Sequence, residues 1–201
     1  DSVRQFRFEA QTRSYWSASS SELETRRHEL IFNTEFESGD QFRISMKDEF
    51  EMLTKAFRIA PKVTLDPGDY DFTSYQTSYR LGPQRKYSGQ LSYRFGDFWG
   101  GTNSAIGLSG GSIELSPQLS VEPSYSFNKV KLPEGNFRTE LSRVRVTYTI
   151  SPRMYFSGLV QYNSTQNSAS SNFRFRWEWA PGSELFVVYS DDRDTNPLDR
   201  P

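Results

Sequence analysis

Apolar and polar residues alternate with a period of two along most of the chain. Between residues 119 and 128, the odd-numbered positions carry Leu, Val, Pro, Tyr and Phe, whereas the even-numbered positions carry Ser, Glu, Ser, Ser and Asn. The segments 87–96 and 172–179 follow the same rule, with aromatic residues on one side and Ser, Gln, Asn, Arg or Glu on the other. Successive side chains of a strand point to opposite faces, whereas helical spacing would spread these residues around a cylinder. The pattern therefore predicts strands with one apolar and one polar face.

Similar segments recur from Phe6 to Tyr189 and predict about eleven strands, most of them near the length of about ten residues that a tilted bilayer crossing needs. Short turn sequences rich in Gly, Pro, Asp and Ser separate some of the strands, at 38–40, 82–84, 116–118, 151–153 and 180–183. Longer polar connections separate the others, at 55–69, 97–103, 129–136 and 164–171. Short turns on one rim and long loops on the other are typical of an outer-membrane barrel.

Three segments are less clear. A capping-box pattern at Ser21–Leu30 would suit the start of a helix, but the alternation of His28, Leu30 and Phe32 favours a strand. The run Leu185–Tyr189 is apolar on both sides, so its register is ambiguous. The segment Asp191–Pro201 has the composition of a loop.

The composition supports a barrel wall. Hydrophobic residues make up 35% of the chain, yet aromatic residues make up 15%, with 16 Phe, 11 Tyr and 4 Trp. Aromatic residues favour pleated sheets and membrane interfaces, and disordered chains are poor in them. A mean hydropathy of -0.72 is compatible with membrane insertion if every second residue faces a polar interior.

Charge and reactive residues exclude several kinds of function. The 24 basic and 25 acidic residues give a net charge of -1, which provides no general attraction to nucleic acid. With no cysteine and with His28 as the single histidine, the chain has no catalytic triad and no Cys/His metal site. Asp192, Asp194 and Asn196 imitate half of a calcium loop, but the glycine and glutamate that complete such a loop are absent. We therefore expect no catalytic residue, no cofactor, no metal and no enzyme activity.

The charged residues of the alternating segments form the expected lining of a polar interior, in which neighbouring strands pair opposite charges. The residues that we assign to this polar row are Arg43, Lys47, Glu49, Arg80, Arg94, Glu122, Glu140, Arg143, Arg145, Arg174, Arg176 and Glu178. The residues that we assign to a lipid-facing surface or an aromatic belt are Tyr93, Phe95, Trp99, Tyr125, Phe127, Val144, Val146, Tyr148, Phe173, Phe175, Trp177 and Trp179.

Two alternatives stay open at this point. Phe98 and Trp99 could stack on sugar rings from a loop, as aromatic residues do in carbohydrate-binding modules, although the recurrence of aromatic residues along many strands favours a belt. The charged rows would also suit the solvent face of a soluble sheet.

Several blocks of residues between Val63 and Asp191 carry a family resemblance. The blocks are Pro67–Tyr70, Gly96–Gly101, Leu132–Phe137, Gln161–Ser164, Asn172–Arg174 and Trp177–Tyr189. In these blocks and their order, the chain resembles Gram-negative outer-membrane proteins of poorly defined function, in which a carbohydrate-binding-module-like domain precedes a C-terminal β-barrel. The resemblance covers about two-thirds of the chain and brings no catalytic residue with it.

Together these observations predict an all-β fold, namely an antiparallel up-and-down transmembrane β-barrel or a large barrel segment of about eleven or more strands. We expect residues 1–201 to form a single barrel domain, as a fragment that lacks the closing C-terminal strand and any N-terminal module. The expected function is a pore, anchor or scaffold in the bacterial outer membrane. Its expected partners are the lipid bilayer and another chain or domain that completes or plugs the wall. The alternative is a soluble all-β carbohydrate-binding module.

Overall fold

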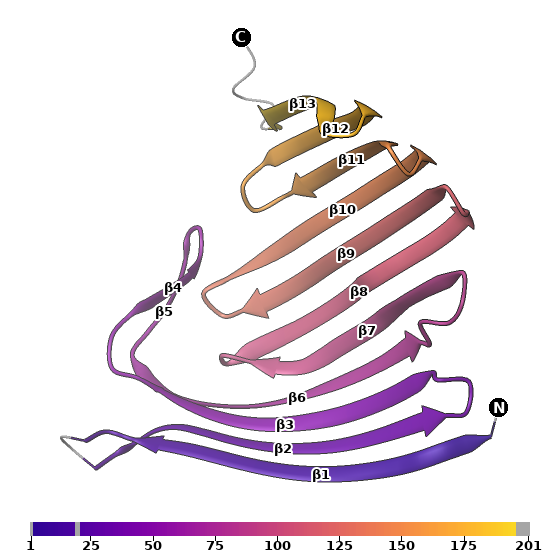
Figure 1. Ribbon diagram of the computed structural model, residues 1–201. Helices are drawn as coiled ribbons and strands as arrows, with labels where there is room; N and C mark the ends of the chain where they lie inside the picture. Colours follow the sequence, from indigo (N-terminus) through magenta and orange to yellow (C-terminus); the bar gives the residue numbers. More distant parts are fainter. Residues whose placement is uncertain (1, 19–20, 196–201) are drawn as a thin grey trace. The chain divides into compact units, whose positions relative to one another are not determined.

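The protein is built from antiparallel strands. The computed structural model describes residues 2–18 and 21–195, and all the regular secondary structure within them is β (Figure 1). A large sheet of 11 strands has the order β1-β2-β3-β6-β7-β8-β9-β10-β11-β12-β13, and β4 and β5 form a separate two-stranded sheet. The strands of the large sheet are β1 (Val3–Trp16), β2 (Leu23–Phe36), β3 (Gln41–Leu53), β6 (Gly68–Leu81), β7 (Tyr87–Phe98), β8 (Gly101–Ser116), β9 (Leu119–Leu132), β10 (Gly135–Ser151), β11 (Met154–Asn163), β12 (Ser168–Ala180) and β13 (Ser183–Asp194). The prediction of an all-β, up-and-down sheet of this size is confirmed.

The large sheet has two edges within the described residues, because β1 and β13 each have a single neighbour in the strand order. Closure into a barrel therefore stays a prediction. Every other strand has a partner on each side, which satisfies its backbone N–H and C=O groups. In the part of the chain that the structure describes, no helix is long and apolar enough to span a membrane.

The chain divides into two compact units. Unit 1 consists of Asp1–Arg80, Leu91–Ile106 and Asn128–Arg138, and unit 2 consists of Leu81–Gln90, Gly107–Phe127 and Thr139–Pro201. Strands β7 to β10 each contribute a segment to both units.

The strand register of unit 1 sorts side chains by polarity. Phe8 pairs with Phe32, which in turn pairs with Ile44, so apolar residues of β1, β2 and β3 share one side of the sheet. Three positions away along β2 and β3, Glu29 pairs with Lys47 on the opposite side. Because a slip of one residue would exchange the two faces of a strand, this alternation fixes the register.

Unit 2 repeats the arrangement in β10 to β13. Tyr148 pairs with Phe156, Phe156 with Phe175, and Phe175 with Val187, on one side of the sheet. On the other side, Arg174 pairs with Val188. The register of Leu185–Tyr189, which the sequence leaves ambiguous, is thereby fixed: Leu185, Val187 and Tyr189 share the apolar side, whereas Phe186 and Val188 lie on the polar side.

A small hydrophobic core lies under the β4–β5 hairpin, which is formed by β4 (Phe57–Ala60) and β5 (Val63–Leu65). Leu65 is fully buried, and Val63, Val130 and Leu132 join it in one cluster. Leu53, Ile59, Ala60, Phe98, Trp99 and Phe137 pack around this cluster. The hairpin lies on the polar side of unit 1, because Leu53 of β3 follows the same alternation as Lys47 and Glu49.

The predicted long connections are mostly wrong. The segments 97–103 and 129–136 contain only the turns between β7 and β8 and between β9 and β10, at residues 99–100 and 133–134. The segment 164–171 is a turn followed by the start of β12, and 55–69 holds the β4–β5 hairpin. The strands are longer than their apolar stretches, and their polar ends read as loops in the sequence.

Two other sequence interpretations are settled. Ser21–Leu30 does not start a helix, because Leu23–Phe36 is strand β2. The pairing of Arg193 with Ala169 and of Asp191 with Ser171 continues β13 to Asp194, so the prediction of a loop from Asp191 onward is wrong for these residues. The rest of that segment, residues 196–201, lies outside the described residues.

Candidate functional site

The first candidate surface is the apolar row of unit 1, which runs across β1, β2, β3, β6 and β7. Its members are Phe6, Phe8, Leu30, Phe32, Phe36, Phe42, Ile44, Met46, Tyr75, Tyr79, Tyr93 and Phe95. Most of these side chains are exposed, with Phe8 reaching 78%. Ring contacts link neighbouring strands, since the centroid of Phe32 lies 4.9 Å from that of Phe8, and the centroids of Tyr75 and Phe95 are 5.5 Å apart. The row is thus a continuous apolar surface that no described residue of unit 1 covers.

Unit 2 carries a corresponding apolar row. Its members are Val144, Val146, Tyr148, Ile150, Phe156, Val160, Tyr162, Phe173, Phe175, Trp177, Leu185, Val187 and Tyr189. Phe173 stacks between Phe156 and Tyr189, with centroid distances of 6.0 and 6.3 Å. Gly158 makes room for it, because a Cβ atom at Gly158 would lie 2.9 Å from the Phe173 ring.

Buried hydrophobic side chains are scarce beside these rows. Within the described residues they are Ile31, Val63, Leu65, Phe72, Val130 and Leu132. Ile31 pairs with Ser45 and Phe72 pairs with Glu49, which places both on the polar side of unit 1, and the other four form the hairpin cluster. A soluble sheet of this size normally buries one face against a second layer. Here the sheet keeps its apolar side chains outside its own core.

The apolar rows have a limited depth along the strands. Leu30–Phe36 in β2 and Val144–Ile150 in β10 each span about 20 Å, at about 3.3 Å per residue. Before Leu30 in β2, the same side of unit 1 carries charged residues. Arg26 lies there, 3.8 Å from Asp48 and 3.6 Å from Asp71. The hydrophobic band of an outer-membrane barrel is about 25 Å tall, so the dimensions are similar.

The polar row of unit 1 is held together by ion pairs between neighbouring strands. Arg27 lies 2.5 Å from Glu49, and Glu29 lies 3.5 Å from Arg43 and 4.0 Å from Lys47. The carboxylate-bearing side chains of Glu29 and Glu49 are 15% and 16% exposed, so these pairs are partly withdrawn from solvent. Partial burial reduces screening by salt and strengthens such pairs relative to fully exposed ones.

In unit 2 the polar row combines ion pairs and amide contacts. Arg176 pairs with Glu184 across β12 and β13 and lies 4.0 Å from Glu178. Asn172 accepts a hydrogen bond of 3.0 Å from Arg174 and donates one of 2.6 Å to Ser190. These contacts link polar side chains of β12 and β13 on this side of the sheet.

Most residues of the predicted polar row lie on the polar side of their strands. Strand pairing or alternation places there Arg43, Lys47, Glu49, Arg80, Arg94, Glu122, Arg143, Arg145, Arg174, Arg176 and Glu178. Glu140 is the exception, and its assignment is wrong. It shares the parity of Val144 on β10, and the Tyr125 side chain hydrogen-bonds its carboxylate. The charge of Glu140 misleads because the apolar side of β10 turns polar toward that end of the strand.

The predicted apolar residues follow the same test. Tyr93, Phe95, Tyr125, Phe127, Val144, Val146, Tyr148, Phe173, Phe175 and Trp177 lie on the apolar sides of their strands, and Trp179 lies 6.0 Å from Trp177, ring to ring. Trp99 does not. It occupies the turn after β7 with a φ of 49° and packs against Phe72 and Tyr70, with centroid distances of 5.4 and 5.2 Å. The assignment of Trp99 to a lipid-facing belt is therefore wrong.

The remaining candidates for chemistry are also placed. The ring Nδ1 of His28 lies 3.1 Å from the Thr12 hydroxyl on the exposed surface of unit 1. Asp192 and Asp194 lie on β13, whereas Asn196 falls outside the described residues. Across residues 2–18 and 21–195, no three His, Asp or Glu side chains gather in the way that a metal site needs.

The β4–β5 hairpin and its cluster are a feature that the sequence interpretation missed. The alternation of Val63 and Leu65 just before Pro67 is the signal that could have revealed a short strand. The second missed feature is a hollow beside Lys129 and Lys131 of β9, which the sequence interpretation assigned to a loop.

The geometry as a whole consists of two extended surfaces, one apolar and one ionic, on opposite sides of the strands in each unit. Such a wall can separate hydrocarbon from water. No protein-family model, no curated protein and no solved structure matches the chain.

Proposed function

We propose that this chain forms the wall of a β-barrel in the bacterial outer membrane and serves there as a pore, anchor or scaffold. The observation that carries the proposal is the bare apolar row of each unit, backed on the other side of the same strands by ion pairs and polar side chains. In hydrocarbon every backbone polar group must be paired, and a continuous antiparallel sheet meets that requirement away from its edges. The lipid bilayer is the proposed partner of the apolar rows.

The two edge strands define what else the wall requires. β1 and β13 each have one side without a strand partner in the described residues, and unpaired edges are not tolerated in hydrocarbon. The proposal therefore includes completion of the wall by further strands or by another chain. A barrel domain over residues 1–201 that needs such completion, without catalytic residues of its own, is part of the same proposal.

The alternative function, a soluble carbohydrate-binding module, has less support. Phe98 and Trp99, the candidates for stacking on a sugar, are half-buried and pack around the hairpin cluster. Trp99 also lies against Phe72 and Tyr70. A soluble module would also expose Phe6, Phe8 and their neighbours to water, at a cost of about 25 cal/mol for each Å² of apolar surface. A lipid environment removes that cost.

Membrane insertion is the experiment that tests the proposal. The denatured chain is diluted into buffer alone, into a neutral detergent, and into vesicles of phosphatidylcholine with short acyl chains. We expect it to float with the vesicles, to resist protease there, and to migrate differently on a gel with and without heating. A stable, monodisperse protein in plain buffer would contradict the proposal.

Conductance across a planar bilayer then distinguishes the proposed roles. Discrete current steps would indicate a pore, with an interior set by residues such as Arg43, Glu49, Arg145 and Arg174. Insertion without current would indicate an anchor or scaffold.

A further inference from the structure

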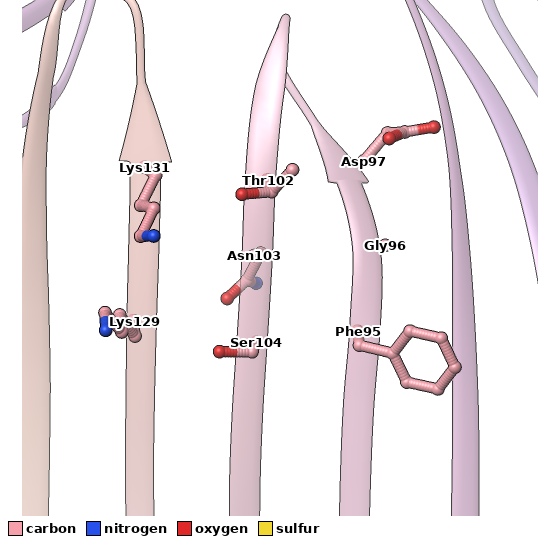
Figure 2. Close-up of a pocket in the computed structure, with 8 residues that line it drawn as sticks. All are labelled: Phe95, Gly96, Asp97, Thr102, Asn103, Ser104, Lys129 and Lys131. Atoms are coloured by element: carbon pink, nitrogen blue, oxygen red, sulfur yellow. The ribbon is translucent and has the colours of Figure 1, made fainter.

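A hollow of about 400 Å³ lies at one end of unit 1, over β7, β8 and β9 (Figure 2). Its lining comprises Phe95, Gly96, Asp97, Thr102, Asn103, Ser104, Lys129 and Lys131. Figure 2 shows Thr102 and Ser104 on the middle strand, with Lys129 and Lys131 on one neighbouring strand and Phe95 and Asp97 on the other. The hollow therefore brings cationic groups, hydroxyl groups and an aromatic ring together.

The hollow lies on the same side of the strands as the apolar row of unit 1, just past the end of that row. Phe95 belongs to the apolar row of unit 1 through its stacking on Tyr75. Along β8, Thr102 and Ser104 share the parity of the exposed Ile106. Along β9, Lys129 and Lys131 continue the odd-numbered series that is apolar up to residue 127. Apolar side chains thus give way to hydroxyl groups on β8 and to ammonium groups on β9, and Asp97 follows Phe95 at the same end of β7.

The two lysines are free to bind a ligand. Within residues 2–18 and 21–195, no ion pair or hydrogen bond engages the ammonium group of either Lys129 or Lys131. Arg27, Arg43 and Lys47 of the polar row, by contrast, all have carboxylate partners. Asp97 also lines the hollow, but it lies on β7, with strand β8 between it and the lysines. The side chains of the lining carry two positive charges and one negative charge.

Spacing and chemistry both suit an oxyanion. Alternate residues of a strand are about 6.6 Å apart, so the ammonium groups of Lys129 and Lys131 can approach one tetrahedral anion from two sides. Hydroxyl groups such as those of Thr102 and Ser104 donate to phosphate oxygens, and lysine binds phosphate as a point charge. A phosphate group bound here would leave attached acyl chains beside Phe95 and the apolar row.

We propose that Lys129 and Lys131, assisted by the hydroxyl groups of Thr102 and Ser104, bind the phosphate group of an anionic lipid at the border of the apolar surface. This inference rests on the proposed function, because the acyl chains need a bilayer beside the apolar row. The same phosphate chemistry could come from a soluble phosphate. The lipid is the proposed source because the hollow adjoins exposed apolar side chains.

Lipid retention by the chain tests the inference. The full chain, in neutral detergent, is titrated with dilauroyl phosphatidylglycerol, with dilauroyl phosphatidylcholine, and with inorganic phosphate, and the bound phosphorus per chain is measured. The variant K129A/K131A removes both ammonium groups. The control K55A/K86A removes two exposed lysines that lie outside the hollow.

The expected result is preferential binding of phosphatidylglycerol that K129A/K131A weakens roughly ten- to thirty-fold, since a basic side chain at a membrane surface contributes about 1 kcal/mol. The control should bind like the parent chain, and K129R/K131R should retain most of the affinity. The variant D97N, which removes the one carboxylate of the lining, should bind more tightly.

Three outcomes would overturn the inference. These are equal losses in K129A/K131A and K55A/K86A, equal affinity for phosphatidylcholine and phosphatidylglycerol, and inorganic phosphate binding as tightly as the lipid. The last outcome would assign the site to a soluble phosphate. A chain that inserts into vesicles but shows any of these outcomes contradicts this inference alone, whereas a chain that does not insert contradicts the proposed function as well.

Discussion

Lysine substitutions at two adjacent valines of β13 can show which side of the strand faces lipid and which side faces water. Val187 and Val188 are the same residue type and are similarly exposed, at 50% and 54%. They point to opposite sides, because Val187 pairs with Phe175 of the apolar row and Val188 pairs with Arg174 of the polar row. V187K and V188K therefore make the same replacement, valine by lysine, on the two opposite faces of one strand.

The two substitutions should differ in cost by several-fold. Val187 lies in the middle of the apolar run Leu185–Tyr189, about 7 Å from either end, so a lysine there would sit near the centre of the hydrocarbon. A lysine at the midplane of a barrel costs about 2–4 kcal/mol, or roughly thirty- to several-hundred-fold in the folding equilibrium. At Val188 the lysine would meet water and the like charge of Arg174, at a cost of about 0.2–1 kcal/mol.

Folding into vesicles at increasing urea concentration measures both costs. Tryptophan fluorescence reports the transition, and the gel shift on heating reports the folded fraction. We expect the midpoint of V187K to fall well below that of the parent chain and the midpoint of V188K to stay close to it. Equal losses for the two variants, or a greater loss for V188K, would refute the assignment of the faces.

Three further predictions concern the fold itself. G96A should lower the free energy of unfolding in urea by about 1–3 kcal/mol more than G68A does. A Cβ atom at Gly96 would lie 2.4 Å from a backbone carbonyl oxygen of β6, whereas Gly68 has a similar φ and no neighbour within 4 Å. Similar midpoints for the two variants would contradict this close approach. L65A should lower the free energy of unfolding by about 2–5 kcal/mol and expose the β4–β5 hairpin to protease, since Leu65 is 0% exposed. An unchanged cleavage pattern would contradict the claim that the cluster holds the hairpin in place. A double-mutant cycle of R27A and E49A should give a coupling of about 0.5–1 kcal/mol that weakens with salt, and a coupling of zero would show that the pair is incidental.

The sequence predicts the strands well where one side of a strand keeps one polarity. In β9 the odd-numbered residues are apolar from 119 to 127, and this pattern correctly predicts a strand. The strand continues to Leu132, but Val130 and Leu132 are even-numbered and the odd positions become Lys129 and Lys131. The apolar and polar sides of β9 thus exchange within one continuous strand. The hairpin covers the even-numbered side there, and the odd-numbered side lies past the end of the apolar row. A periodicity argument reads that inversion as the end of the strand.

A similar inversion in β8 has a backbone cause. Ile106 and Leu108 precede Gly110 and are even-numbered, whereas Ile113 and Leu115 follow it and are odd-numbered. Gly110 has a φ of 58°, a conformation that favours glycine, and the phase of the alternation changes around it. Here the glycine itself is the signal that the sequence offers.

The candidate surfaces were predictable in part for the same reason. Residues within the alternating stretches, such as Arg174 and Phe175, lie on the expected sides because nearest neighbours along a strand decide which way a side chain points. The sequence does not predict the positions of Glu140 and Trp99. Residue type alone does not reveal where along β10 one side changes polarity, or that the Trp99 side chain in a turn packs against Phe72.

The sequence by itself determined the all-β class, the number of strands in the large sheet, and the two-sided character of each strand, because these depend on a period of two that local geometry imposes. Only the tertiary structure decided which strands pair and in which register, and how the β4–β5 hairpin buries Leu65. It also decided that Lys129 and Lys131 share a hollow with Thr102 and Ser104. These features join residues far apart in the chain, and their energies arise from packing between strands, which no local pattern encodes.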